Sequence, residues 1–190
     1  MSNSIDLLNA AVIVVNLLRV SGHECVIAGG AARDIAHSVP FRDVDIIVRT
    51  EKTGLYELLD SIGFKCYEDN EYQNEEACGR IRSVWKYQQL KGIDVIVYNQ
   101  DNFATVDECI EFGFDCNMSQ YKLEHQLYDS WLVRALHIGD EAVKILRDDV
   151  SIKRLERLIE IANNLGWDST ELQQRVTEAK EREGKIPTFG

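Results

Sequence analysis

The sequence predicts an α/β (α+β) fold, in which a small mixed β-sheet has flanking helices and a C-terminal helical segment. Three observations support this prediction. Short β-branched runs alternate with segments of helical periodicity, glycines separate the two kinds of segment, and the last third of the chain has mostly helical spacing. With 190 residues, of which 45% are hydrophobic, the chain is long enough for one compact unit with its own core.

An amphipathic helix is expected to open the chain. Apolar residues recur at helical spacing over residues 7–18, Ser4 precedes them as the expected N-cap, and Ser21-Gly22 ends the helix. The apolar run over residues 25–28 then predicts a strand. After Gly29-Gly30, the residues that begin with Ala31 are expected to form one or two helical turns. The predicted order is therefore strand, glycine turn and helix.

Three further strands are expected at residues 44–48, 80–90 and 93–98. Pro40 disfavours helix just before the first of them, which is rich in β-branched residues. Lys91-Gly92 is the expected turn of a hairpin between the other two. Residues 55–62 have helical spacing, and Gly63 ends that helix.

From residue 121 onward the spacing of apolar residues favours helices. Positions 123, 127, 131 and 132 have this spacing, as do the apolar residues between Ile152 and Ala162, and Gly166 ends the second helix. Residues 169–190 form a charged tail. We therefore divide the chain into a core of residues 1–120 and a C-terminal helical segment of residues 121–190, packed together as one compact unit.

The composition restricts the partners of the protein. Its net charge is −11 and its sequence pI is about 4.8, so the surface as a whole repels phosphate backbones. DNA binding is therefore not expected, and an RNA partner would need a local basic patch.

The sequence indicates a cytoplasmic protein with no membrane partner. Its most apolar segment, residues 5–20, contains Asp6 and Arg19. It is shorter than the roughly 20 residues that cross a bilayer, and it lacks the basic region and cleavage site of a secretory signal. The five cysteines form no C-x-x-C pair, so they are expected to be reduced thiols, and no chemistry is assigned to the four scattered histidines.

Three aspartates are the candidate metal ligands and catalytic residues. Asp43 and Asp45 are two residues apart at the start of a predicted strand, where side chains at i and i+2 point to the same face about 7 Å apart. Asp94 lies in another short apolar strand. Carboxylates this close repel, and a divalent cation keeps them charged. Three aspartates can hold two Mg²⁺ (or Mn²⁺) ions, which suits in-line attack on a phosphate.

The glycine turn is the candidate triphosphate site. Gly29-Gly30 directly after a strand lets backbone N–H groups approach a nucleotide closely, and Arg33, one turn later, could clamp a phosphate or ribose oxygen. Each motif alone is more often structural: a D-x-D pair is usually a solvated loop, and Arg33-Asp34 a surface ion pair. Their order and spacing together indicate nucleotide chemistry.

This arrangement resembles the nucleotidyltransferase superfamily related to DNA polymerase β, and within it the head domain of bacterial CCA-adding enzymes and poly(A) polymerases. Residues 27–34 resemble the family's G-G-x-x-R-D element, and residues 42–46 resemble its D-x-D element. The resemblance implies a nucleotidyltransferase core in which the aspartates bind metal and the Gly29-Gly30 turn, with Arg33 and Asp34, holds the incoming NTP.

Two weaker similarities extend along the chain. Residues 114–121 are similar to the family's D-F-T-I-N-A-x-x-Y stretch, which makes Asn117 a candidate nucleotide-binding residue, whereas Gly113 and Asp115 stand where the family has Asp and Thr. Residues 148–167 resemble the first neck helix, in which an Asp and an Arg read the nucleotide base. The counterparts in this chain, which the resemblance makes candidates for nucleotide binding, are Asp149, Arg154 and Arg157.

The register of the neck-like helix is open, because Lys153 competes with Arg154, and an ordinary amphipathic helix with basic surface residues is the alternative. The family's body and tail, which grip tRNA, would need well over a hundred more residues by the size of ordinary domains. Autonomous tRNA binding is therefore not expected of this acidic chain.

The leading hypothesis is a metal-dependent nucleotidyltransferase that transfers NMP from an NTP to a hydroxyl and releases pyrophosphate. The acceptor is left open among an RNA 3′ end, a protein and a small molecule, and so is the preferred base. The alternative is a non-catalytic nucleotide-binding or interaction module that retains the fold, which the departures at Gly113 and Asp115 motivate.

Overall fold

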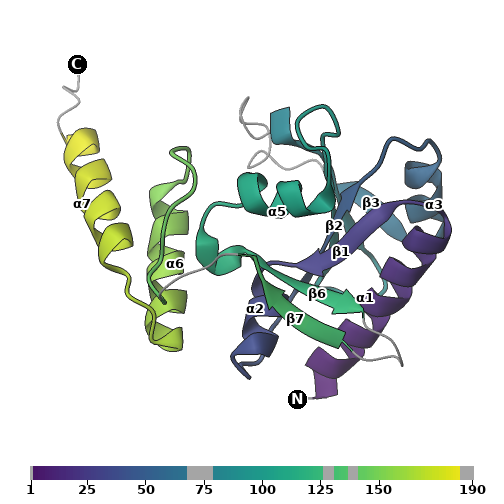
Figure 1. Ribbon diagram of the computed structural model, residues 1–190, viewed down its shortest axis with the longest axis horizontal. Helices are drawn as coiled ribbons and strands as arrows, with labels where there is room; N and C mark the ends of the chain where they lie inside the picture. The colour runs from purple at the N-terminus through teal and green to yellow at the C-terminus, as the bar shows by residue number, and fades with distance from the viewer. Residues whose placement is uncertain (1, 68–78, 126–130, 137–140, 185–190) are drawn as a thin grey trace.

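The computed structural model describes residues 2–67, 79–125, 131–136 and 141–184, which form a mixed seven-stranded sheet, covering helices and two C-terminal helices (Figure 1). The strand order is β3-β4-β5-β2-β1-β6-β7. The strands are β1 (Glu24–Ala28), β2 (Val44–Arg49), β3 (Phe64–Tyr67), β4 (Ile81–Tyr87), β5 (Ile93–Tyr98), β6 (Tyr121–His125) and β7 (Trp131–Ala135). The helices are α1 (Ser2–Val20), α2 (Gly30–Ala36), α3 (Leu55–Ser61), α5 (Val106–Gly113), α6 (Ile152–Leu165) and α7 (Thr170–Gly184).

The centre of the sheet brings three distant segments to one edge. Strands β2 and β5 pair in parallel, with Asp45 opposite Asp94, while β1 pairs antiparallel with β2 and places Ala28 opposite Asp45. The turn that follows Ala28 therefore lies beside Asp45, and Asp94 lies one strand farther along the sheet. The other strand pairs of the described sheet are antiparallel.

The two faces of the sheet bury different sets of side chains. Val44 and Ile46 are fully buried in the core that α1 and α3 cover, as the alternation of β2 predicts. Ile47 and Tyr98 pack on the opposite face against α5. Both faces of β2 are thus covered in its middle, and its start carries the aspartates.

The structure confirms most of the predicted elements, from the opening helix to the hairpin of β4 and β5 and the helix that ends at Gly166. The prediction of Ser4 as an N-cap was wrong. The helix already begins at Ser2, and the Ser4 hydroxyl donates instead to the carbonyl of Phe41 at 3.0 Å. Gly92 has φ 99°, and its carbonyl accepts from Val44 N at 2.7 Å, which ties the hairpin turn to the start of β2.

The prediction of helical structure at positions 123 to 132 was also wrong. Residues 121–125 and 131–135 form the antiparallel strands β6 and β7, and β6 adds to β1 at the sheet. Tyr121 and Leu123, two residues apart, are both buried, so tertiary pairing overrode the four-residue spacing. Leu127 lies outside the described residues.

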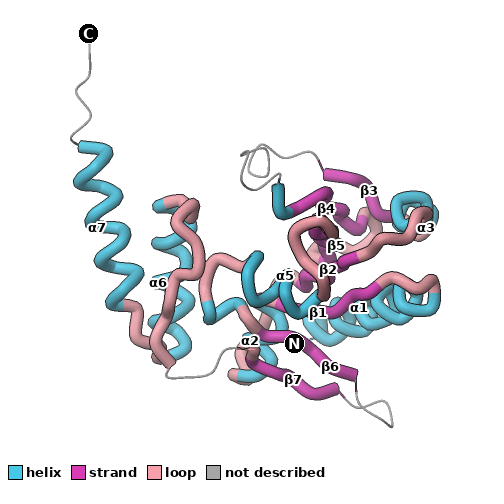
Figure 2. The backbone as a smooth tube through the Cα atoms, turned by 45° about the horizontal axis from the view of Figure 1, so that its top comes forward, coloured by secondary structure: helices cyan, strands magenta, loops and turns pink. Residues whose placement is uncertain are grey.

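Helices α6 and α7 lie side by side, beyond the end of the sheet that carries the turn after β1 (Figure 2). The buried residue Leu158 of α6 and Leu172 of α7 share the main core. No described helix is long and apolar enough to cross a membrane. Cys25, Cys109 and Cys116 are buried thiols outside any disulfide.

Candidate active site

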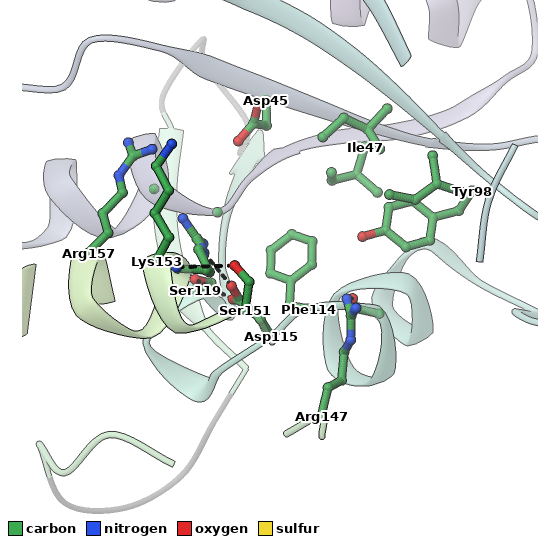
Figure 3. Close-up of a pocket in the computed structure, with 16 residues that line it drawn as sticks. Asp45, Ile47, Tyr98, Phe114, Asp115, Ser119, Arg147, Ser151, Lys153 and Arg157 are labelled. Carbon is green, nitrogen blue, oxygen red and sulfur yellow. Dashed lines mark hydrogen bonds and ion pairs between the residues drawn. The ribbon is translucent and has the colours of Figure 1, made fainter. Parts of the chain in front are cut away.

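A cavity of about 460 Å³ lies between the edge of the sheet and the first turns of α6 (Figure 3). It is lined on the sheet side by Gly29-Gly30 and by Asp45, and on the helix side by Lys153, Arg154 and Arg157. Of the residues that the sequence singled out, the structure brings five to this cavity: Gly29, Gly30, Asp45, Arg154 and Arg157.

The three predicted carboxylates lie at the same end of the sheet, and we call Asp43, Asp45 and Asp94 the carboxylate edge. Asp45 lines the cavity, and Asp43 and Asp94 flank it outside the lining. Asp45 and Asp94 are register partners on neighbouring strands, and Asp43 is two residues before Asp45. Burial, and then the negative charges of Asp43 and Asp94, raise the pKa of Asp45 to about 7. Burial likewise raises the pKa of Asp94, which the ammonium of Lys86, 3.9 Å away, partly offsets.

The carboxylate edge fits a divalent cation in ligand chemistry and in charge. Oxygen ligands suit Mg²⁺. Repulsion between the carboxylates contributes to the raised pKa of Asp45, and a bound cation would instead attract each carboxylate. Within the described residues, no group of three or more histidine, cysteine, aspartate or glutamate side chains is arranged closely enough to hold an ion. The side chains of the edge would therefore have to close around a cation that binds there.

The glycine turn has a backbone conformation that only glycine adopts easily. Gly29 has φ 84° and ψ −141°, and a Cβ there would lie 3.6 Å from Asp45 Oδ2 and 3.7 Å from Phe114. The Gly29 N–H donates to the carbonyl of Tyr121 at 2.9 Å, so this one donor of the turn is already engaged. The turn thus sets the wall of the cavity directly beside Asp45.

Arg33 and Asp34 support the turn from outside the cavity. The Arg33 guanidinium is almost fully buried and donates through Nε and Nη2 to Asp34 Oδ1, at 2.8 and 2.6 Å. A Cβ on Gly30 would lie 3.6 Å from Arg33 Nη2, which places the guanidinium against the turn. Burial raises the pKa of Asp34, and the charge of Arg33 opposes that shift.

Asn117 and Asp149 also lie outside the lining of the cavity and hold the chain around it. Asn117 Nδ2 donates to the carbonyl of Ala142 at 2.9 Å, and its Oδ1 accepts from Lys144 N at 2.8 Å. Asp149 accepts from Arg147 Nε at 2.7 Å and pairs with Arg80. These contacts fix the segment that leads into α6.

Arg147 and Asp149 form the ion pair at the base of this segment. Hydrogen bonds from Arg147, which outweigh the effect of burial, and a further bond from Arg80 lower the pKa of Asp149 to about 2. Arg147 also donates from Nη1 to the carbonyl of Gly113 at 2.9 Å, and it lines the cavity. Every nitrogen of the Arg147 guanidinium is therefore engaged.

Helix α6 presents three cations to the cavity. The Ser151 side chain caps the helix by accepting from Arg154 N at 3.3 Å. Arg154 Nε pairs with Asp115 Oδ2 at 2.5 Å. Burial alone would raise the pKa of Asp115, but the charge of Arg154 and its hydrogen bond hold that pKa below its usual range.

Lys153 and Arg157 differ from Arg154, because they are exposed and have no ion-pair partner among the described residues. Figure 3 shows both side chains extending from α6 along one side of the cavity. The charges of Arg154 and Arg157 partly oppose the rise in the pKa of Asp45 that burial and the neighbouring carboxylates cause, since both guanidinium groups face Asp45 across the cavity.

The same architecture occurs in solved structures of tRNA-processing enzymes. The protein is similar to a CCA-adding enzyme in an apo form (TM-score 0.60, 13% identity, 95% of this chain and 44% of that one). It is also similar to a tRNA nucleotidyltransferase complexed with a primer tRNA and an incoming ATP analog (0.54, 21%, 87% and 50%). A CCA-adding enzyme with CTP has a TM-score of 0.61 at 15% identity, over 93% of this chain and 42% of that one.

The protein therefore shares its fold with these solved structures. The chain spans about half the length of these structures. Comparisons with protein-family models and with curated proteins give no match. At this level of identity the likeness establishes the fold alone. The positions of the carboxylate edge and of the α6 cations are observed in this chain.

The sequence analysis missed the apolar part of the cavity. Ile47 and Ile96 line it, each two residues beyond an aspartate of the carboxylate edge. The signal was present, since side chains at i and i+2 of a strand share a face. Arg147 was missed as well, and nothing local in the sequence marks it, because its partners Asp149 and Gly113 O are set by the fold.

Proposed function

We propose that the protein is a metal-dependent nucleotidyltransferase, which transfers NMP from an NTP to a hydroxyl acceptor and releases pyrophosphate. One observation supports this most strongly: Asp45, flanked by Asp43 and Asp94, lies at one wall of a cavity whose other wall carries three cations. Catalysis of phosphoryl transfer is mainly positioning and charge neutralisation, and such a cavity offers both.

Each wall has a distinct task. Asp43, Asp45 and Asp94 would hold Mg²⁺ or Mn²⁺, which supplies charge neutralisation at the reacting phosphate when bound. Lys153 and Arg157 point into the cavity with no partner among the described residues, and they bind the phosphates of the NTP. Arg154 is oriented by Asp115 and adds a third positive charge.

The proposed transfer is a single displacement at the α-phosphorus of the NTP. The acceptor oxygen forms a bond to the α-phosphorus while the bond between that phosphorus and the α,β-bridging oxygen breaks, and pyrophosphate leaves with the electron pair. The proton of the acceptor hydroxyl passes to water. The acceptor lies on the side of the α-phosphate opposite to the leaving pyrophosphate.

An NTP is the proposed donor. Two of the similar structures hold an incoming ATP analog or CTP, and one of these also holds a primer tRNA. An RNA 3′ end is therefore one candidate acceptor, beside a protein side chain and a small molecule.

Titration of the protein with each NTP, in Mg²⁺ and in EDTA, tests the proposal. We expect binding that requires Mg²⁺ and slow release of pyrophosphate with water as the acceptor. Asp43→Asn and Asp45→Asn should strongly reduce both, whereas Asp101→Asn, at an exposed site outside the cavity, should resemble the parent. Nucleotide binding without pyrophosphate release, under all acceptors offered, would instead identify a nucleotide-binding module.

A further inference from the structure

The cavity has two chemically different ends. The α6 cations occupy one end, and the other, which we call the apolar compartment, is lined by Ile47, Ile81, Ile96, Tyr98 and Phe114. Figure 3 shows Ile47, Tyr98 and Phe114 on one side of Asp45, and the α6 side chains on the other side. The proposed reaction centre therefore separates a cationic end from an apolar one.

The apolar compartment is formed by the sheet and by the end of α5. Ile47 and Tyr98 are buried, and Ile81 and Ile96 are half-buried with faces open to the cavity. Gly113 makes room for Tyr98, since a Cβ there would lie only 2.4 Å from the ring. The family that the sequence resembles has an aspartate at the position of Gly113, so this is one of the positions at which the chain departs from it. The ring of Tyr98 thus lines the apolar compartment beside Gly113, which has no side chain.

The apolar compartment offers little to a phosphate. Of the described residues that line this end of the cavity, Arg147 is the one cation, and all of its nitrogens are engaged by Asp149 and by the carbonyl of Gly113. A phosphodiester placed beside the isoleucines would lose its hydration without gaining a partner, which is costly. At the opposite end, Lys153 and Arg157 have no ion-pair partner among the described residues.

In-line displacement decides which substrate enters each end. The attacking oxygen and the leaving pyrophosphate must lie on opposite sides of the α-phosphorus. Pyrophosphate carries several negative charges and is drawn to Lys153 and Arg157, so the acceptor approaches from the other side of Asp45. That side is the apolar compartment.

We propose that the apolar compartment is the acceptor site and that it takes a hydroxyl on an uncharged aromatic group, the phenol of a tyrosine side chain in a protein. This inference rests on the proposed function and deepens it. Tyr98 and Phe114 offer ring contacts, and the isoleucines offer apolar surface, to a planar ring. The Tyr98 hydroxyl, which Figure 3 shows directed toward Phe114, can hydrogen-bond a polar edge of the acceptor.

The test measures binding and transfer separately. N-acetyl-tyrosinamide, N-acetyl-serinamide and a short RNA with a 3′-hydroxyl are titrated into the protein with Mg²⁺ and a non-hydrolysable NTP, and then offered as acceptors with labelled NTP. The variants are Ile81→Gln and Ile96→Gln in the compartment. Ile13→Gln, at an exposed position of α1, is the matched control.

We expect N-acetyl-tyrosinamide to bind and to accept the label on its phenol. Ile81→Gln and Ile96→Gln should weaken this binding about tenfold, as expected for an altered apolar pocket, and leave the dissociation constant of the NTP unchanged. Ile13→Gln should bind both ligands as the parent does. A preserved NTP affinity shows that a variant with weakened phenol binding is folded.

Two results would overturn the inference. One is that RNA binds or accepts the label while N-acetyl-tyrosinamide does neither. The other is that the isoleucine variants weaken NTP binding instead, which would assign the compartment to the base. Failure of the proposed function is a separate result, namely the absence of Mg²⁺-dependent NTP binding. In that case, the binding of N-acetyl-tyrosinamide to the parent and to the isoleucine variants still decides whether the apolar compartment takes an aromatic ring.

Discussion

The two walls of the cavity are positioned by different kinds of interaction. On the sheet wall, backbone pairing sets Asp45 opposite Asp94. On the α6 wall, Arg154 is positioned by its side-chain pair with Asp115, which lies 39 residues away in sequence. Backbone hydrogen bonds do not titrate, whereas carboxylate–arginine pairs weaken in acid. Substitutions and pH should therefore affect the walls differently, and the sheet wall should keep its geometry when the α6 wall is disturbed.

The largest effect is expected for Asp45→Asn, which should lower activity while it raises stability. Loss of a metal ligand should reduce kcat on the order of a hundredfold to a thousandfold. Because burial and the neighbouring carboxylates raise the pKa of Asp45 to about 7, the ionised form is unfavourable in the folded protein without metal. In EDTA the variant should be more stable by about 1 kcal/mol, and the difference should grow as pH rises from 4 toward 7. Thermal unfolding over this pH range measures the difference.

In the same assay, Mg²⁺ should stabilise the parent and not Asp45→Asn. Asp101→Asn serves as the control, because Asp101 is exposed and lies outside the cavity. A variant that is less stable than the parent in EDTA and equally active would show that Asp45 has a structural role only.

Asp149→Asn should destabilise the protein through the α6 wall. Arg147 and Arg80 lower the folded-state pKa of Asp149 to about 2, below its usual value. A depressed pKa contributes stability that is complete well above the usual value and is lost as pH falls toward the folded value. The contribution at neutral pH is about 2 kcal/mol, lost between roughly pH 5 and pH 2. Denaturant unfolding at pH 7 and pH 3 measures it.

The neighbouring substitution Asp148→Asn is the matched control for Asp149→Asn. The Asp148 side chain is fully exposed, and its pair with Arg175 at 3.0 Å contributes little. Two outcomes would show that the pair of Asp149 with Arg147 does not position the segment that leads to α6. One is an equal loss of stability in the two variants at pH 7, and the other is a destabilisation by Asp149→Asn that persists at pH 2.

The strands and the turn of the sheet wall could be predicted because their determinants are local. Apolar residues identify β1 and β2, and Gly29-Gly30 directly follows β1. Asp45 lies in β2, and Asp43 directly precedes that strand. Helix α5 could also have been predicted, since Thr105 accepts from Glu108 N at 3.1 Å and the pair has the spacing of a capping box. Strands β6 and β7 could not be identified from helical spacing, because β6 joins the sheet by a long-range pairing with β1, and β7 then pairs with β6.

The α6 wall could be predicted only in part, because it depends on contacts between distant residues. Helix periodicity and Gly166 identified α6 itself. Nothing in the local sequence states that Arg154 pairs with Asp115, or that Asp149 is held by Arg80 and lies outside the cavity lining. Arg154 and Asp115 are 39 positions apart in the sequence, and Arg80 and Asp149 are 69 positions apart. Both pairs therefore form only when the chain folds.

Gly29→Ala tests the sheet wall with a smaller expected effect. At φ 84° and ψ −141°, a side chain at this position costs about 1–3 kcal/mol. The new Cβ would also lie 3.6 Å from Asp45 Oδ2, so we expect weaker NTP binding along with the loss of stability. Gly54→Ala is the control: Gly54 has φ 87° but lies in the left-handed helical region with open space around it. Equal effects of both variants on NTP binding would exclude a role for the turn.

Lys153→Ala tests the α6 wall at its most exposed cation, where the smallest effect is expected. Loss of one phosphate contact should weaken NTP binding about fivefold to tenfold, or about 1 kcal/mol. The fold should be unaffected, because the Lys153 side chain is exposed and has no ion-pair partner among the described residues. The dependence of the dissociation constant on salt concentration should become shallower, since one charge no longer faces the triphosphate. Lys65→Ala, which removes a surface cation that pairs with Asp60 outside the cavity, should change neither quantity. An unchanged salt dependence in Lys153→Ala would show that α6 contributes to the cavity by shape and not by charge.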